Sequence, residues 1–66
     1  MARVYLVDDA GGLELVDRAI IDGVPHTEAG YPMARTDRTR TLKGWPDTSV
    51  REWVTDVGNV YLVPEA

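Results

Sequence analysis

Few side chains of this 66-residue sequence could carry acid–base or metal chemistry. His26 is the one histidine and there is no cysteine, which excludes a disulfide, a thiolate zinc site and a cysteine nucleophile. Asp8, Asp9 and Asp22 could form a carboxylate cluster, but they lack the regular spacing of a calcium-binding loop. We therefore expect no enzymatic activity, no metal and no cofactor. The alternative is a ligand- or metal-binding enzyme fragment that uses these four residues.

The second group of candidate residues is a basic strip over residues 35–43. It holds four cations and a single acid in a chain whose net charge is −4, and these cations are Arg35, Arg38, Arg40 and Lys43. Such a strip could bind acidic groups of another protein, or simply guard the edge of a sheet. A nucleic-acid-binding module using residues 35–43 is an alternative. We do not expect nucleic acid as the partner, because the acidic remainder would repel its phosphates.

Aromatic residues complete the set of candidate partner-binding residues. Trp45 follows a glycine in a turn and could pack on the next element or anchor a partner. Trp53 lies in an apolar pattern and is predicted to be a core residue. Tyr5 and Tyr61 occupy the same position in two copies of the tetrapeptide Val-Tyr-Leu-Val. The predicted contact residues are thus Tyr5, Arg35, Arg38, Arg40, Lys43, Trp45 and Tyr61.

The elements that must position these residues are mainly strands. Residues 3–7, 13–21, 34–42 and 60–63 are rich in β-branched and aromatic residues or alternate in polarity, which predicts a small sheet of three to four short strands. The two glycines at 11 and 12 are typical of a hairpin link between the first two strands. Apolar residues of segment 13–21 also recur at helical spacing, so a helix is the alternative there.

Residues 22–33 contain two glycines and two prolines, which predicts a long loop. Residues 48–57 are predicted to form the one helix. The Ser49 to Glu52 spacing fits a capping box, and Gly58 could end the helix. The apolar residues of this segment follow helical spacing: Val50, Trp53, Val54 and Val57. A hairpin in this region is the alternative.

Together these elements predict an α+β fold in one small domain over residues 1–66. The repeated tetrapeptide, at residues 4–7 and 60–63, is apolar on both faces of each strand. Such strands belong in the middle of a sheet. Because one short helix covers only one face of a sheet, another chain would have to cover the rest.

Size and composition favour a protein that works in contact with other chains. A domain of this length buries only about 60% of its unfolded surface, and association can supply the missing stability. No apolar run is long enough to span a membrane, so we expect a cytoplasmically synthesised protein without a membrane partner. We predict a non-enzymatic structural or interaction subunit of a homo-oligomer or larger assembly. A virion or bacteriophage accessory protein fits this description, and an inhibitor that binds a host protein is an alternative.

Overall fold

A computed structural model describes residues 2–41 and 49–65, and all regular structure in these two ranges is β-strand. The predicted α+β class is therefore wrong. No helix able to cross a membrane occurs in the described ranges. The strands are β1 (Ala2–Val7), β2 (Leu13–Arg18), β3 (Ile20–Ile21), β4 (Val24–Pro25), β5 (Ala34–Thr41), β6 (Ser49–Val54) and β7 (Val60–Pro64).

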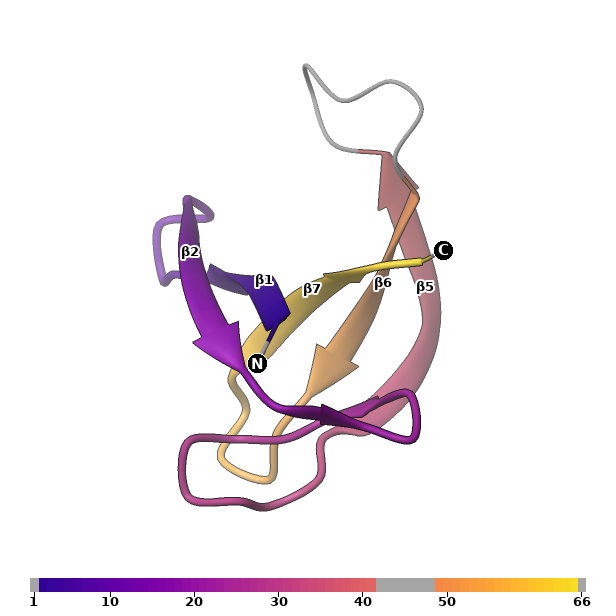
Figure 1. Cartoon of the computed structure of the whole chain (residues 1–66). Coiled ribbons are helices and arrows are strands. Elements are labelled where there is room, and N and C mark those ends of the chain that lie inside the picture. Colours follow the sequence, from indigo (N-terminus) through magenta and orange to yellow (C-terminus); the bar gives the residue numbers. More distant parts are fainter. Residues whose placement is uncertain (1, 42–48, 66) are drawn as a thin grey trace.

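Five of these strands form one antiparallel sheet in the order β2-β1-β7-β6-β5. The sheet curls, with β2 at one edge and β5 at the other, and the short β3–β4 hairpin runs between the two edges at one end (Figure 1). The first and last strands pair with each other, with Leu6 opposite Tyr61. The prediction that both copies of the repeated tetrapeptide lie in the middle of a sheet is confirmed.

The predicted helix over 48–57 is replaced by strand β6 and a turn, although Thr48 lies outside the described residues. Val50 and Trp53 are both buried, but they belong to two different apolar clusters. A strand buried on both faces does not alternate in polarity, so its apolar residues can imitate helical spacing. Here the β-branched and aromatic side chains, which favour extended backbone, decided the outcome.

The glycine expected to end that helix instead closes the β6–β7 hairpin. Gly58 has a φ of 87°, a left-handed conformation that glycine adopts without steric cost. Its amide donates to the carbonyl of Thr55 at 3.0 Å, and the amide of Thr55 donates to the carbonyl of Asn59 at 2.9 Å. A C-terminal helix cap and a tight hairpin therefore both favour glycine at this position.

The core is divided by the sheet into two clusters. The larger cluster lies on the face that β4 and the following segment cover, which we call the inner face; its buried residues are Val4, Met33, Trp53, Tyr61 and Val63. The smaller cluster, on the outer face, contains buried Val50 and Leu62 with half-buried Tyr5 and Val7 beside them. Trp53 is 8% exposed, which confirms its predicted place in the core.

The structure differs from the other predicted segments only in detail. Segment 13–21 is extended, as β2 and β3 on either side of Ala19, so the helical alternative is wrong. The predicted loop over 22–33 contains β4, and an isolated bridge joins His26 to Pro32. The predicted strand 34–42 is β5, described to Thr41.

Candidate functional site

Most of the large exposed apolar side chains of the described chain lie along β2 and β3. Six large apolar side chains are exposed in the described residues, and four of them lie between residues 13 and 21: Leu13, Leu15, Ile20 and Ile21. Leu13 and Leu15 are 45% and 48% exposed. Four exposed apolar side chains in two consecutive strands are more than the scattered single ones normal on a protein surface, and they indicate a surface that contacts other molecules.

Leu13 and Leu15 also continue the outer-face cluster. In the β1–β2 register, Leu13 is opposite Val7 and Leu15 is opposite Tyr5, and directly opposed residues share one face of a sheet. The apolar surface therefore extends from buried Leu62 in β7 across β1 to the free edge of β2. At this edge, the main chain and the exposed apolar side chains of β2 are therefore accessible together to another molecule.

The two edges of the sheet differ in how well they are protected against pairing with a further strand. The register of β5 shifts between Arg35 and Thr39, and such a bulge, together with exposed charged side chains, discourages pairing with a further strand. In β2, by contrast, six consecutive residues pair with β1 without a shift. Neither strand contains a proline or a lysine, so the bulge in β5 makes the difference. Of the two edges, β2 is the better template for strand addition.

The described members of the predicted basic strip form ion pairs within the chain. Arg38 Nη1 and Arg40 Nη2 lie 3.5 Å and 3.3 Å from the two carboxylate oxygens of Glu52, a buried residue of β6. The expectation that this strip could bind acidic groups of another protein thus has an internal competitor. Lys43 and Trp45 lie outside the described residues.

Arg35, the remaining described member of the strip, belongs to a separate cluster at Glu65. Glu65 Oε1 accepts a hydrogen bond from Arg51 Nε at 2.6 Å and a longer one from Arg35 Nη2 at 3.4 Å. The hydrogen bond from Arg51 and the charges of both arginines hold the pKa of Glu65 below its ordinary value, while partial burial opposes this shift. This cluster fastens β7 to β6 and β5.

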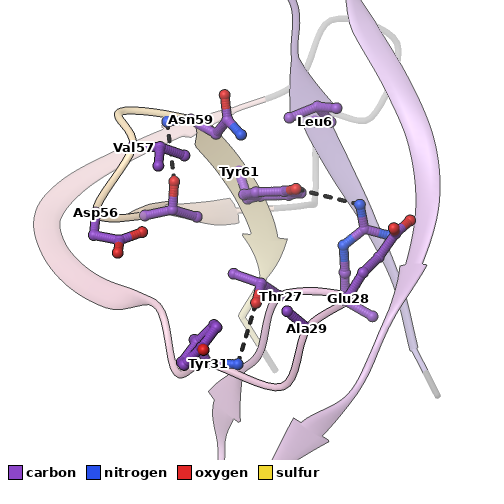
Figure 2. Close-up of a pocket in the computed structure, with 11 residues that line it drawn as sticks. Leu6, Thr27, Glu28, Ala29, Tyr31, Asp56, Val57, Asn59 and Tyr61 are labelled. Carbon is purple, nitrogen blue, oxygen red and sulfur yellow. Dashed lines mark hydrogen bonds and ion pairs between the residues drawn. The ribbon is translucent and has the colours of Figure 1, made fainter.

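A pocket of about 520 Å³ lies between the loop after β4 and the β6–β7 turn (Figure 2). Tyr31 and Val57, which are 68% and 76% exposed, lie among its lining residues. Glu28 and Asp56 also line it, and Arg18 is the one cation among its lining residues. With two acids and one base, this pocket has no charge excess that would select an anion.

Arg18 has a structural role at this pocket. It is 8% exposed, and its Nη1 donates to the main-chain carbonyl of Asp17 at 2.7 Å. Nη2 donates to the hydroxyl of Tyr61 at 3.2 Å, as Figure 2 shows by a dashed line. Nη1 also lies 3.4 Å from the exposed carboxylate of Glu28. These contacts join the end of β2 to β7 and to the loop after β4.

Tyr5 and Tyr61, the predicted aromatic contacts, occupy different environments. Tyr61 is 4% exposed, so its ring belongs to the inner core and not to the surface. Tyr5 is half-buried on the outer face beside Leu15. Of this pair, only Tyr5 reaches the apolar surface that ends at β2.

The residues of the alternative enzyme or metal site have local roles. Oδ1 of Asp8 accepts the amides of Ala10 and Gly12, at 3.0 Å and 2.7 Å, and so closes the β1–β2 turn. Asp22 has a φ of 52° in the β3–β4 turn. Nδ1 of His26 lies 2.8 Å from the carbonyl oxygen of Val24. No group of three potential metal ligands occurs within residues 2–41 and 49–65.

Sequence analysis missed Leu13 and Leu15 as site residues, although it placed them in a strand. The available signal was their alternation directly after a glycine hairpin link, which puts both side chains on one face. The position of this strand at the edge of the sheet depends on the strand order, which the local sequence does not contain.

Comparison with protein-family models, curated proteins and solved structures finds no match to this chain.

Proposed function

We propose that this chain is a non-enzymatic interaction subunit that enters a homo-oligomer or a larger assembly through strand β2. The observation that carries the proposal is a regular, unshifted edge strand with two half-exposed leucines on one face. Pairing by strand addition supplies main-chain hydrogen bonds, and the alternate side chains supply selectivity. A virion or phage accessory complex is one assembly of this kind.

A nucleic-acid-binding role receives less support. Arg38 and Arg40 lie against the buried carboxylate of Glu52, so a phosphate would have to compete with an ion pair that already exists. The net charge of −4 adds a general repulsion. An inhibitor of a host protein would use the same docking chemistry as an assembly subunit and differs only in the identity of its partner.

Photo-crosslinking in the cells that naturally make the protein tests this proposal. A photoreactive amino acid replaces Leu15 in β2, and a matched control carries it at Asp37, an exposed position in β5 at the opposite edge. We expect discrete protein adducts from position 15 and far fewer from position 37. Absence of adducts at position 15, or equal labelling of both positions, would show that β2 is not a contact strand.

A further inference from the structure

The free edge of β2 exposes the main chain of alternate residues, and the β1–β2 turn shows which ones. The amide of Asp8 donates to the carbonyl of Gly12, so the next pair, Val7 and Leu13, does not exchange hydrogen bonds. Alternation along the hairpin then directs the amides and carbonyls of Glu14, Val16 and Arg18 toward β1. Those of Leu13, Leu15 and Asp17 point away from the sheet.

We propose that the strand completing this edge is β2 of a second copy, paired antiparallel about a two-fold axis at Leu15. This inference rests on the proposed function and names its partner. The combined sheet would hold ten strands, and each β2 edge would cover the other. Association would then stop at the dimer, as closed two-fold symmetry requires.

The register follows from the alternation. Hydrogen-bonded pairs must join residues that both point outward, which allows a two-fold axis at a residue but not between residues. Within β2, only axes at Glu14, Leu15 or Val16 form more than one such pair. The axis at Leu15 pairs Leu15 with its own copy and Leu13 with Asp17 on each side. Each such pair exchanges two hydrogen bonds, so these three pairs make six. The carbonyl of Asp17 already accepts from Arg18 Nη1 at 2.7 Å and would accept the new bond with its second lone pair. The axis at Val16 loses one of these pairs, and the axis at Glu14 places two carboxylates face to face.

The chemistry of the edge also fits a second copy. Glu14 and Asp17 are the exposed acids of β2, and Arg3 of β1 lies 3.9 Å from Asp17, while buried Arg18 is already paired with Glu28. Two acids against one base leave this edge with one of the four net negative charges of the chain, so repulsion between two copies at the edge is small. In the Leu15 register, each Glu14 lies opposite Val16 of the other copy. The exposed leucines of both chains would form one apolar strip on the outer face.

The size of this contact sets its expected strength. Pairing of two six-residue strands buries less surface than the roughly 1,200 Å² at the lower end of stable interfaces. We therefore expect a dissociation constant on the order of 1–100 µM. Leu15→Lys would place two like charges at the axis, and we expect it to raise the dissociation constant at least about tenfold.

Sedimentation equilibrium of the purified chain from about 1 µM to 1 mM measures the association. We expect a transition from the 7.3 kDa monomer to twice that mass, and no larger species. Leu15→Lys should remain monomeric at concentrations where the native chain is a dimer, with an unchanged circular dichroism spectrum. Asp37→Lys, at the opposite edge, should dimerise as the native chain does. A monomer at every concentration, or open-ended growth, would overturn the proposal.

Disulfide trapping tests the register, since the chain has no cysteine of its own. At the axis the two Cα atoms lie about 5.5 Å apart, within the range of a disulfide. Leu15→Cys should therefore form a covalent dimer under mild oxidation. Asp17→Cys should not, because its two copies are separated by four residues, about 13 Å. A mixture of Leu13→Cys and Asp17→Cys should give the mixed dimer.

Crosslinking of Leu15→Cys no faster than that of Asp37→Cys would exclude this register. The failure of this inference can be distinguished from the failure of the proposed function. If the photoreactive residue at position 15 captures only a different protein, the second copy is not the partner, although β2 is still a contact strand. If it captures nothing, both proposals fail.

Discussion

Replacing Trp53 by alanine removes the largest side chain of the inner core. Trp53 is 8% exposed and lies opposite Tyr61 in the β6–β7 pair. Truncation of a buried tryptophan costs about 3–5 kcal/mol of unfolding free energy. At roughly 0.05–0.15 kcal/mol per residue, a 66-residue domain has about 3–10 kcal/mol in total. We therefore expect Trp53→Ala to lose most of its stability or to be unfolded without denaturant.

Urea unfolding followed by far-ultraviolet circular dichroism measures this loss without depending on tryptophan fluorescence. Val57→Ala is the matched control, since this side chain is 76% exposed and should change stability by no more than about 0.5 kcal/mol. If Trp53→Ala is already unfolded, Val63→Ala in the same cluster provides a smaller, measurable loss of about 1.5–3 kcal/mol. A loss below about 1 kcal/mol for Trp53→Ala would refute the assignment of this ring to the core.

Three further predictions concern the polar contacts. Tyr61→Phe removes the hydroxyl that accepts from buried Arg18, and urea unfolding should show a loss of about 1–3 kcal/mol; an unchanged midpoint would contradict this contact. Because the folded-state pKa of Glu65 lies below the ordinary 4.5, its stabilising effect is complete above pH 4.5 and is lost as pH falls through the folded value. Glu65→Gln should therefore flatten the decline of the urea midpoint in acid, and an equally steep decline would exclude the cluster as its cause. Labelled duplex DNA should bind, by fluorescence anisotropy, no more tightly than the ~1–100 µM of non-specific complexes; sub-micromolar affinity that Arg38→Ala with Arg40→Ala abolishes would make nucleic acid the favoured partner.

The central strands were predictable because their signal is local and redundant. Each copy of Val-Tyr-Leu-Val is apolar on both faces, which is compatible only with a covered strand. Strands β1 and β7 accordingly lie side by side in the middle of the sheet. Trp53 was likewise assigned to the core from its apolar neighbours, even though the element that carries it was not recognised.

The error at β6 has a definite physical origin. Val50 and Trp53 are buried in clusters on opposite faces of the sheet, so their spacing of three residues reflects two cores and not one helical stripe. The separation of such patterns requires knowledge of the neighbouring strands, which the local sequence does not contain. Gly58 added to the error because it suits both a helix end and a hairpin.

The candidate site was predictable only in part for a related reason. The strand character of residues 13–18 follows from their alternation, but an edge position is a property of the sheet order. The basic strip was predicted as a contact surface because clustered charge can be read directly from the sequence. Its described members Arg38 and Arg40 are partnered by Glu52, which lies 12 or more residues away along the chain and could not be assigned to them by spacing.

Residue-resolved amide hydrogen exchange tests the central claim, an open β2 edge that another strand completes, most directly. In dilute monomer, the amides of Glu14 and Val16 should be protected by β1, and those of Leu13, Leu15 and Asp17 should exchange rapidly. At concentrations where the chain associates, the amides of the second set should become protected, while Leu15→Lys should leave them open. Protection of Leu13, Leu15 and Asp17 in the dilute monomer, or rapid exchange of these amides after association, would contradict the account.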